Sequence, residues 1–171
     1  MEQNKGIITF KSIFIEKNNM HFTLEVLTNT RKFFIKILEK TSLEDLNKIP
    51  EGFSNNIIWN IGHVLVTQQL LAYKLCGLPM MMSDTLIAKY MKETKPDGFV
   101  SQEEVDEIKG LLSSTIEKTK EDFTNKVFTN FKEYTVSTTG NTLTNIDDAF
   151  QFILFHEGIH LGYVMALNRA I

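Results

Sequence analysis

The chain has 171 residues, of which 43% are hydrophobic and 23% are charged, and its formal net charge is −3. This composition is typical of one soluble globular domain with a core of its own. The small negative charge gives no reason to expect nucleic acid or an anionic membrane surface as a partner. We find no apolar run long enough to span a bilayer and no signal-peptide pattern. Since the single cysteine, Cys76, also excludes an intramolecular disulfide, we expect a cytoplasmic protein.

The first segment in chain order, residues 1–19, contains the strand-like run GIITFKSIFI. We expect it to be an N-terminal extension that is extended or poorly ordered. A first long helix is predicted for residues 21–40, because apolar residues such as Leu24 and Leu27 recur there at steps of three and four. The folded domain is therefore expected to comprise residues 20–171.

A second helix is predicted to begin at Asn55 or Asn56 and to end at Cys76, where Gly77 provides a good residue to follow a helix. Residues 77–100 then form a connection that is long for a helical bundle. This length indicates a crossover between the second and third helices, and we expect a short helix within it near residues 85–92.

A third helix should begin after Ser101, because SQEEV has the pattern of a capping box with Glu104 three residues later. Its apolar residues repeat at helical spacing as far as about Asn125. The next connection, residues 126–144, contains YTVSTTGNTLTN, which is typical of an extended or hairpin segment that turns at Gly140.

A fourth helix is predicted from Asn145 to the end of the sequence, since the Asn145 side chain can cap it and two aspartates follow in its first turn. Four helices of about 20 residues have the length of a compact bundle. The predicted fold is therefore all-α, a four-helix bundle with a long crossover between the second and third helices.

Three histidines are the candidate ligands of a metal ion. His156 and His160 lie one helical turn apart, so both imidazoles can reach one ion. His63 lies among apolar residues of the second helix and should point inward, close to the other two. A single inward histidine is more often a hydrogen-bonded core residue than a ligand. Three that converge from two helices favour a divalent metal site, although a set of core histidines stays open.

The fourth-helix motif HEGIH also fits the HExxH pattern of zinc peptidases, in which the glutamate activates water. The eleven residues that follow His160 contain no His, Asp or Glu to serve as a third ligand. Glu157 lies about 100° around the helix from His156, so it can face solvent or a partner subunit as easily as a bound water. Both observations disfavour a metallopeptidase.

The motifs WNIGH, which ends at His63, and HEGIHLGYV, which begins at His156, occur in the order found in the DinB/YfiT-like superfamily of metal-dependent enzymes. The chain resembles this superfamily from about residue 20 to residue 170. The resemblance implies a bacterial four-helix bundle in which His63, His156 and His160 coordinate a divalent nickel, zinc or iron ion. It also implies a homodimer, since many members form one. Some members conjugate bacillithiol, mycothiol or glutathione to electrophiles, and one related branch isomerises maleylpyruvate.

We therefore expect a divalent-metal-dependent enzyme that acts on a small molecule, either as a thiol S-transferase with a low-molecular-weight thiol as co-substrate or as a hydrolase. The alternative is a non-catalytic, metal-stabilised dimeric bundle that binds a small ligand in a stress response. Beyond the metal ligands no catalytic residue is identified. Candidates for the pocket around the metal, by their positions beside the histidines, are Trp59, Thr67, Tyr163 and Glu157.

Overall fold

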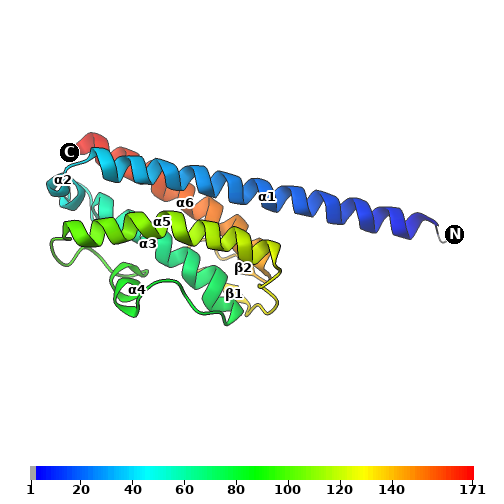
Figure 1. Cartoon of the computed structure of the whole chain (residues 1–171). Helices are drawn as coiled ribbons and strands as arrows, with labels where there is room; N and C mark the ends of the chain where they lie inside the picture. Colours follow the sequence, from blue (N-terminus) through cyan, green and yellow to red (C-terminus); the bar gives the residue numbers. More distant parts are fainter. Residues whose placement is uncertain (1–2) are drawn as a thin grey trace.

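The computed structural model describes residues 3–171, with side chains from Met20 onward, and it is a bundle of long helices (Figure 1). In chain order the elements are α1 (Gln3–Lys40), α2 (Leu43–Asn47), α3 (Ile57–Gln68), the π-helical turn η1 (Gln69–Tyr73), the 3₁₀ turn η2 (Lys74–Cys76), α4 (Asp84–Tyr90), α5 (Gln102–Thr124), β1 (Tyr134–Thr135), β2 (Thr142–Leu143) and α6 (Ile146–Ala170). The helices α1 and α3 each contact both α5 and α6. The predicted all-α bundle is thereby confirmed.

The first helix begins much earlier than expected. Helix α1 is continuous from Gln3, so the strand-like conformation predicted for residues 3–19 is wrong. Once residues 21–40 are helical, each further residue adds a backbone hydrogen bond without a new nucleation cost, and this stretch contains no proline to stop the helix. In Figure 1 the blue N-terminal part of α1 projects beyond the other helices. The division between an extension and a domain at residue 20 stays a prediction.

The ends of the other long helices follow the polar caps that the sequence contains. Asn56 accepts a hydrogen bond from the backbone N–H of Trp59, and Asn145 caps α6 in the same way. Ser101 caps α5 as predicted. The second predicted helix ends at Cys76 as expected, and the φ of 69° at the following Gly77 lies in the left-handed region that glycine tolerates.

The two long connections also have their predicted contents. Helix α4 lies in the crossover between α3 and α5, where a short helix was expected. The strands β1 and β2 pair antiparallel, with Tyr134 opposite Leu143, and Gly140 turns between them with a φ of 75°. Helix α4 packs against α3, and the connection that carries β1 is bonded to η2 through Lys132 and Leu75 (Figure 1). Residues of this connection line the functional region described below.

The core is apolar except for a few buried polar side chains. Two clusters of buried apolar residues fill the bundle, and they include Leu27, Phe34, Leu65, Ile108 and Phe150. A few polar side chains are equally buried, among them Arg31 and Glu157. Within residues 3–171, no helix is both long and apolar enough to cross a membrane.

Candidate metal centre

The packing of α3 against α6 brings the three predicted ligands together. The ring centroid of His63 lies 5.1 Å from that of His156 and 4.9 Å from that of His160. The ring centroids of the two α6 histidines lie 4.5 Å apart. Each ring offers one nitrogen, and these three atoms all lie within 4.8 Å of one another. No other group of three or more His, Cys, Asp or Glu side chains in the described part of the chain has this closeness.

Hydrogen bonds fix the tautomer of His63. Its Nδ1 lies 2.7 Å from the backbone oxygen of Tyr90. A carbonyl oxygen can only accept, so this nitrogen must carry the hydrogen. The other ring nitrogen, Nε2, then carries a lone pair, which can accept from the Thr67 hydroxyl at 3.3 Å or bind a metal ion.

The same reasoning applies to His160. Its Nδ1 lies 2.9 Å from Oδ1 of Asn60. The Asn60 amide cannot be turned over without loss, because its Nδ2 donates to the backbone oxygen of Asn56 at 2.7 Å. The amide oxygen therefore faces His160, whose Nδ1 donates to it and whose Nε2 keeps its lone pair.

Burial keeps all three imidazoles neutral at pH 7. Desolvation, together with repulsion from the charged forms of His160 and His63, lowers the pKa of His156 to about 3. Desolvation likewise lowers the pKa of His160 to about 4. It also lowers the pKa of His63, although the hydrogen bond to Tyr90 opposes this shift. A set of three neutral imidazoles whose ligand nitrogens lie within 4.8 Å of one another fits a divalent transition metal.

His156 adds a second observation in favour of this fit. Its Nδ1 is buried and has no hydrogen-bond partner among the described residues. A buried nitrogen without a partner is costly in a folded protein. An ion bound through Nδ1 of His156 would give this nitrogen a partner and remove that cost.

Gly62 allows the Tyr90 carbonyl to come close enough to accept a hydrogen bond from His63. A Cβ atom on Gly62 would lie 2.6 Å from the Tyr90 ring, closer than atoms approach in proteins. Only glycine therefore lets α4 pack this closely on α3, and this approach brings the Tyr90 oxygen to His63. The hydroxyl of Tyr90 donates to Glu104 of α5, so the tyrosine is held at both ends.

Of the four pocket candidates, Trp59 and Thr67 lie beside His63. The Trp59 ring stacks on the imidazole with a centroid distance of 4.9 Å and an interplanar angle of 8°. The hydroxyl of Thr67 lies 3.3 Å from His63 Nε2. Tyr163 lies elsewhere, with its ring edge against Phe53 at 5.5 Å.

Glu157 is turned into the core. It was expected to face solvent, a partner subunit or a bound water, but its side chain is only 1% exposed and its Oε1 lies 2.6 Å from Nη2 of Arg31. Burial raises the pKa of the Glu157 carboxyl, and the Arg31 guanidinium opposes that rise. The expected direction of Glu157 was wrong because helical geometry gives the angle between neighbouring side chains but does not show which face of α6 another helix packs against. Facing Arg31, this glutamate does not serve as the water-activating group of a zinc peptidase.

A cavity of about 640 Å³ opens above the histidines. Its lining includes the three imidazoles, Thr67, the apolar side chains of Leu71 and Phe152, and several residues of the connection that contains β1. A volume of this size suits a small organic ligand. Trp59, Tyr163 and Glu157 are not among its lining residues.

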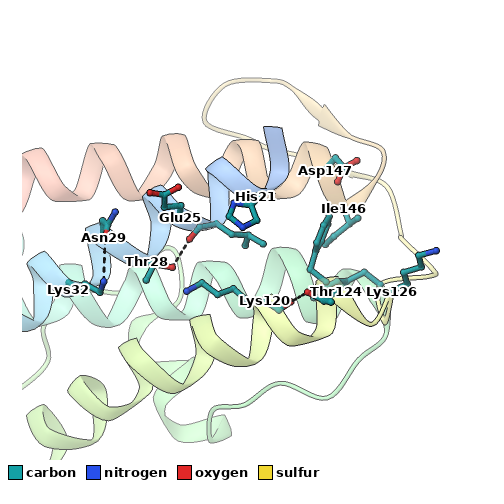
Figure 2. A pocket seen from close by; sticks show the side chains of 13 residues that line it. His21, Glu25, Thr28, Asn29, Lys32, Lys120, Thr124, Lys126, Ile146 and Asp147 are labelled. Carbon is teal, nitrogen blue, oxygen red and sulfur yellow. Dashed lines mark hydrogen bonds between the residues drawn. The ribbon is translucent and has the colours of Figure 1, made fainter. Parts of the chain in front are cut away.

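A larger cavity of about 890 Å³ lies between α1, the end of α5 and the start of α6, with His21 and Lys32 in its lining (Figure 2). It contains none of the three clustered histidines. Size alone therefore does not identify the functional site here, and the chemistry of the lining decides for the smaller cavity.

Two contributors to the site were not identified from the sequence, the Asn60 side chain and the Tyr90 carbonyl. Asn60 could have been noticed, because it is a polar residue in an otherwise apolar stretch and precedes His63 by one helical turn. The role of Tyr90 depends on how the crossover folds back on α3, and no local pattern indicates that.

A helical bundle with three neutral, converging histidines has the donor set of a metal-binding protein. The family model of the DinB superfamily matches residues 27–164, and the chain belongs to this superfamily. Comparison with curated proteins gave no match.

Proposed function

We propose that this chain is a divalent-metal-dependent enzyme, a thiol S-transferase or a hydrolase, in which His63, His156 and His160 hold the ion. The observation that carries the proposal is the pair of hydrogen bonds to Tyr90 and Asn60, which leave the Nε2 atoms of His63 and His160 unprotonated in a cluster whose ligand atoms lie within 4.8 Å of one another. Ligands oriented in this way by a carbonyl and a carboxamide are typical of protein metal sites.

A bound nickel, zinc or iron ion would supply a Lewis acid that lowers the pKa of a thiol or a water molecule. The chain itself contributes the walls of the cavity and the groups that orient a substrate. Leu71 and Phe152 offer an apolar surface that excludes water, and the Thr67 hydroxyl can form a hydrogen bond to a group held near His63.

The lining favours transfer to or from a thiol over hydrolysis. Hydrolysis usually needs a general base close to the attacking water. Glu157, the carboxylate nearest in sequence, is bonded to Arg31, and the carboxylate among the lining residues is Glu133 in the connection that carries β1. A thiolate is already a strong nucleophile once its proton is lost, so it does not require such a base.

The test is metal content by mass spectrometry of the untagged protein after incubation with nickel, zinc or ferrous ion and removal of excess. We expect about one ion per chain. His63→Ala and His160→Ala should each remove most of it, because two imidazoles do not hold an ion tightly. His21→Ala is the matched control, since His21 is exposed and distant from the cluster, and it should retain the ion. A native chain that binds no ion would contradict the proposal.

Turnover separates the two remaining possibilities for a metal-binding chain. Product formation from a thiol and an electrophile, lost on metal removal, would support the enzyme. Tight metal binding with a large gain in stability and no turnover would instead support the non-catalytic, ligand-binding bundle. The homodimer and the cytoplasmic location stay predictions, and the first can be tested by light scattering.

A further inference from the structure

The cavity above the histidines is positively charged at its rim. Lys74, Lys92 and Lys132 line it together with a single carboxylate, Glu133. All four residues are exposed. The chain as a whole has a net charge of −3, so an excess of positive charge here is a local feature and not the result of a basic protein.

Three segments that are distant in the sequence supply these lysines. Lys74 begins η2, Lys92 follows α4, and Lys132 precedes β1. The segments are tied together at the rim, because the backbone N–H of Lys132 donates to the Leu75 oxygen at 2.8 Å and the Lys92 ammonium donates to the Ser137 hydroxyl. These contacts hold the backbone segments that carry the three lysines next to one another.

The positive charges are available to a ligand. In the described part of the chain, the ammonium groups of Lys74 and Lys132 make no hydrogen bond or ion pair, and Lys92 bonds only a neutral hydroxyl. An ammonium has three N–H donors, so Lys92 keeps two of them. Some lysines outside the cavity are instead neutralised, as Lys89 and Lys118 are paired with carboxylates.

The larger cavity in Figure 2 provides a comparison within the same molecule. Its lysines lie among acidic residues, with Glu25 and Asp147 in the same lining. Lys120 is paired there with Glu117 at 2.9 Å. The lining of that cavity has three lysines and two carboxylates, whereas the histidine cavity has three lysines and one carboxylate, so the local excess of positive charge is larger beside the histidines.

We propose that the histidine cavity binds a small molecule with an apolar body and an anionic group, a carboxylate or a phosphate, that Lys74, Lys92 and Lys132 hold at the rim. The apolar body lies against Leu71 and Phe152, between the lysines and the metal ligands. This inference rests on the proposed function, because it takes the cavity to be the substrate site. It adds the charge and polarity of the substrate.

The experiment compares three probes of equal chain length, octanoate, octyl phosphate and 1-octanol, by calorimetric titration of the full chain. Titrations are made with protein loaded with zinc and with protein treated with a chelator. The test variant is Lys74→Gln/Lys92→Gln/Lys132→Gln. The control variant is Lys36→Gln/Lys40→Gln/Lys48→Gln, which removes the same charge from exposed lysines outside the cavity.

We expect at least one of the two anions to bind roughly tenfold or more tightly than the alcohol, as a partly desolvated charge contact allows. The test variant should lose this preference, the control variant should keep it, and added salt should reduce it. The anion that binds more tightly identifies the group that the lysines hold.

Equal affinity for the anions and the alcohol would overturn the inference. So would an anion preference that depends on zinc and not on the lysines, since the anion would then bind the ion alone. Metal content is measured on the same samples, which keeps the two proposals distinguishable. A lysine-dependent preference in a chain that binds no metal would support the anion site and contradict the metal-dependent enzyme.

Discussion

At the scale of single residues, Asn60 decides how well His160 can act as a ligand. Its amide oxygen accepts from His160 Nδ1, and its amide nitrogen is bonded to the Asn56 oxygen, so the acceptor cannot rotate away. Asn60 is not one of the three clustered ligands, and it would act as a positioning residue. Its effect on a metal should therefore appear through the orientation and tautomer of the histidine.

We predict that Asn60→Leu lowers metal affinity by about 10–100-fold, the usual effect of removing such a partner. Competition titration against a chromophoric chelator measures this affinity. Thr67→Val is the matched control, because it removes a hydroxyl near His63 Nε2 without removing an acceptor from any Nδ1. It should not lower the affinity, because in the assigned tautomer this hydroxyl donates to Nε2 and so competes with an ion for that lone pair. Equal losses in the two variants would show that the assigned tautomers are wrong.

At the scale of elements, the contact between α3 and α4 depends on one missing side chain. Gly62 lies in the middle of α3, where glycine ordinarily weakens a helix by about 1 kcal/mol relative to alanine. The Tyr90 ring occupies the space that a Cβ atom would need, which explains why position 62 is glycine although glycine weakens the helix. The same contact brings the Tyr90 carbonyl to His63.

We predict that Gly62→Ala lowers the free energy of unfolding by about 1–3 kcal/mol, because the added atom overpacks the interface. Metal affinity should fall as well, since α4 must move away from His63. Gly110→Ala on α5 is the control, because nothing lies within 4 Å of its added Cβ. It should stabilise the chain by up to about 1 kcal/mol. Urea unfolding of both variants measures the difference, and a stabilised Gly62→Ala would contradict the account.

Much of the element structure was predictable because it is encoded locally. The side chains of Asn56, Ser101 and Asn145 cap the helices that follow them. Such caps involve residues only a few positions apart, so they can be predicted without knowing the tertiary structure. The start of α1 was not predictable in this way. Its first residues, GIITFKSIFI, form a short apolar run that fits a strand or a helix, and only its continuity with the rest of α1 resolves the choice.

The site was predictable to the extent that it follows helical spacing. The turn between His156 and His160 fixes that these two rings share a face, and the apolar surroundings of His63 indicate an inward direction. The direction of Glu157 was not predictable, because it depends on where α1 crosses α6. Nor was the charge of the cavity, since its three lysines come together only through the crossover and the hairpin.

At the scale of the whole molecule, one buried ion pair joins all four long helices. Arg31 on α1 donates to Glu157 on α6 through Nε and Nη2, at 3.2 Å and 2.6 Å. Its remaining donors reach Thr115 on α5 at 2.9 Å and Gln68 on α3 at 3.0 Å. The network is adjacent in sequence to His156, so it also fixes how α6 presents that ligand to α3.

A buried pair of this kind specifies an arrangement more than it stabilises it, because removing two charges from water costs about as much as their attraction returns. Breaking one half is different. Arg31→Met leaves the Glu157 carboxylate buried without its partner, and we predict a loss of about 3–5 kcal/mol in the free energy of unfolding. Urea unfolding in the presence of a chelator measures this loss without a contribution from bound metal.

The double variant Arg31→Met/Glu157→Leu tests the reason for that loss. It removes both charges and fills their volume with apolar atoms, so most of the stability should return, apart from the hydrogen bonds that Thr115 and Gln68 lose. If the double variant is as unstable as the sum of its single changes, the pair itself stabilises the bundle and the desolvation argument is wrong. If stability returns and zinc still binds, the glutamate of the HEGIH motif serves the fold and not the chemistry of the metal.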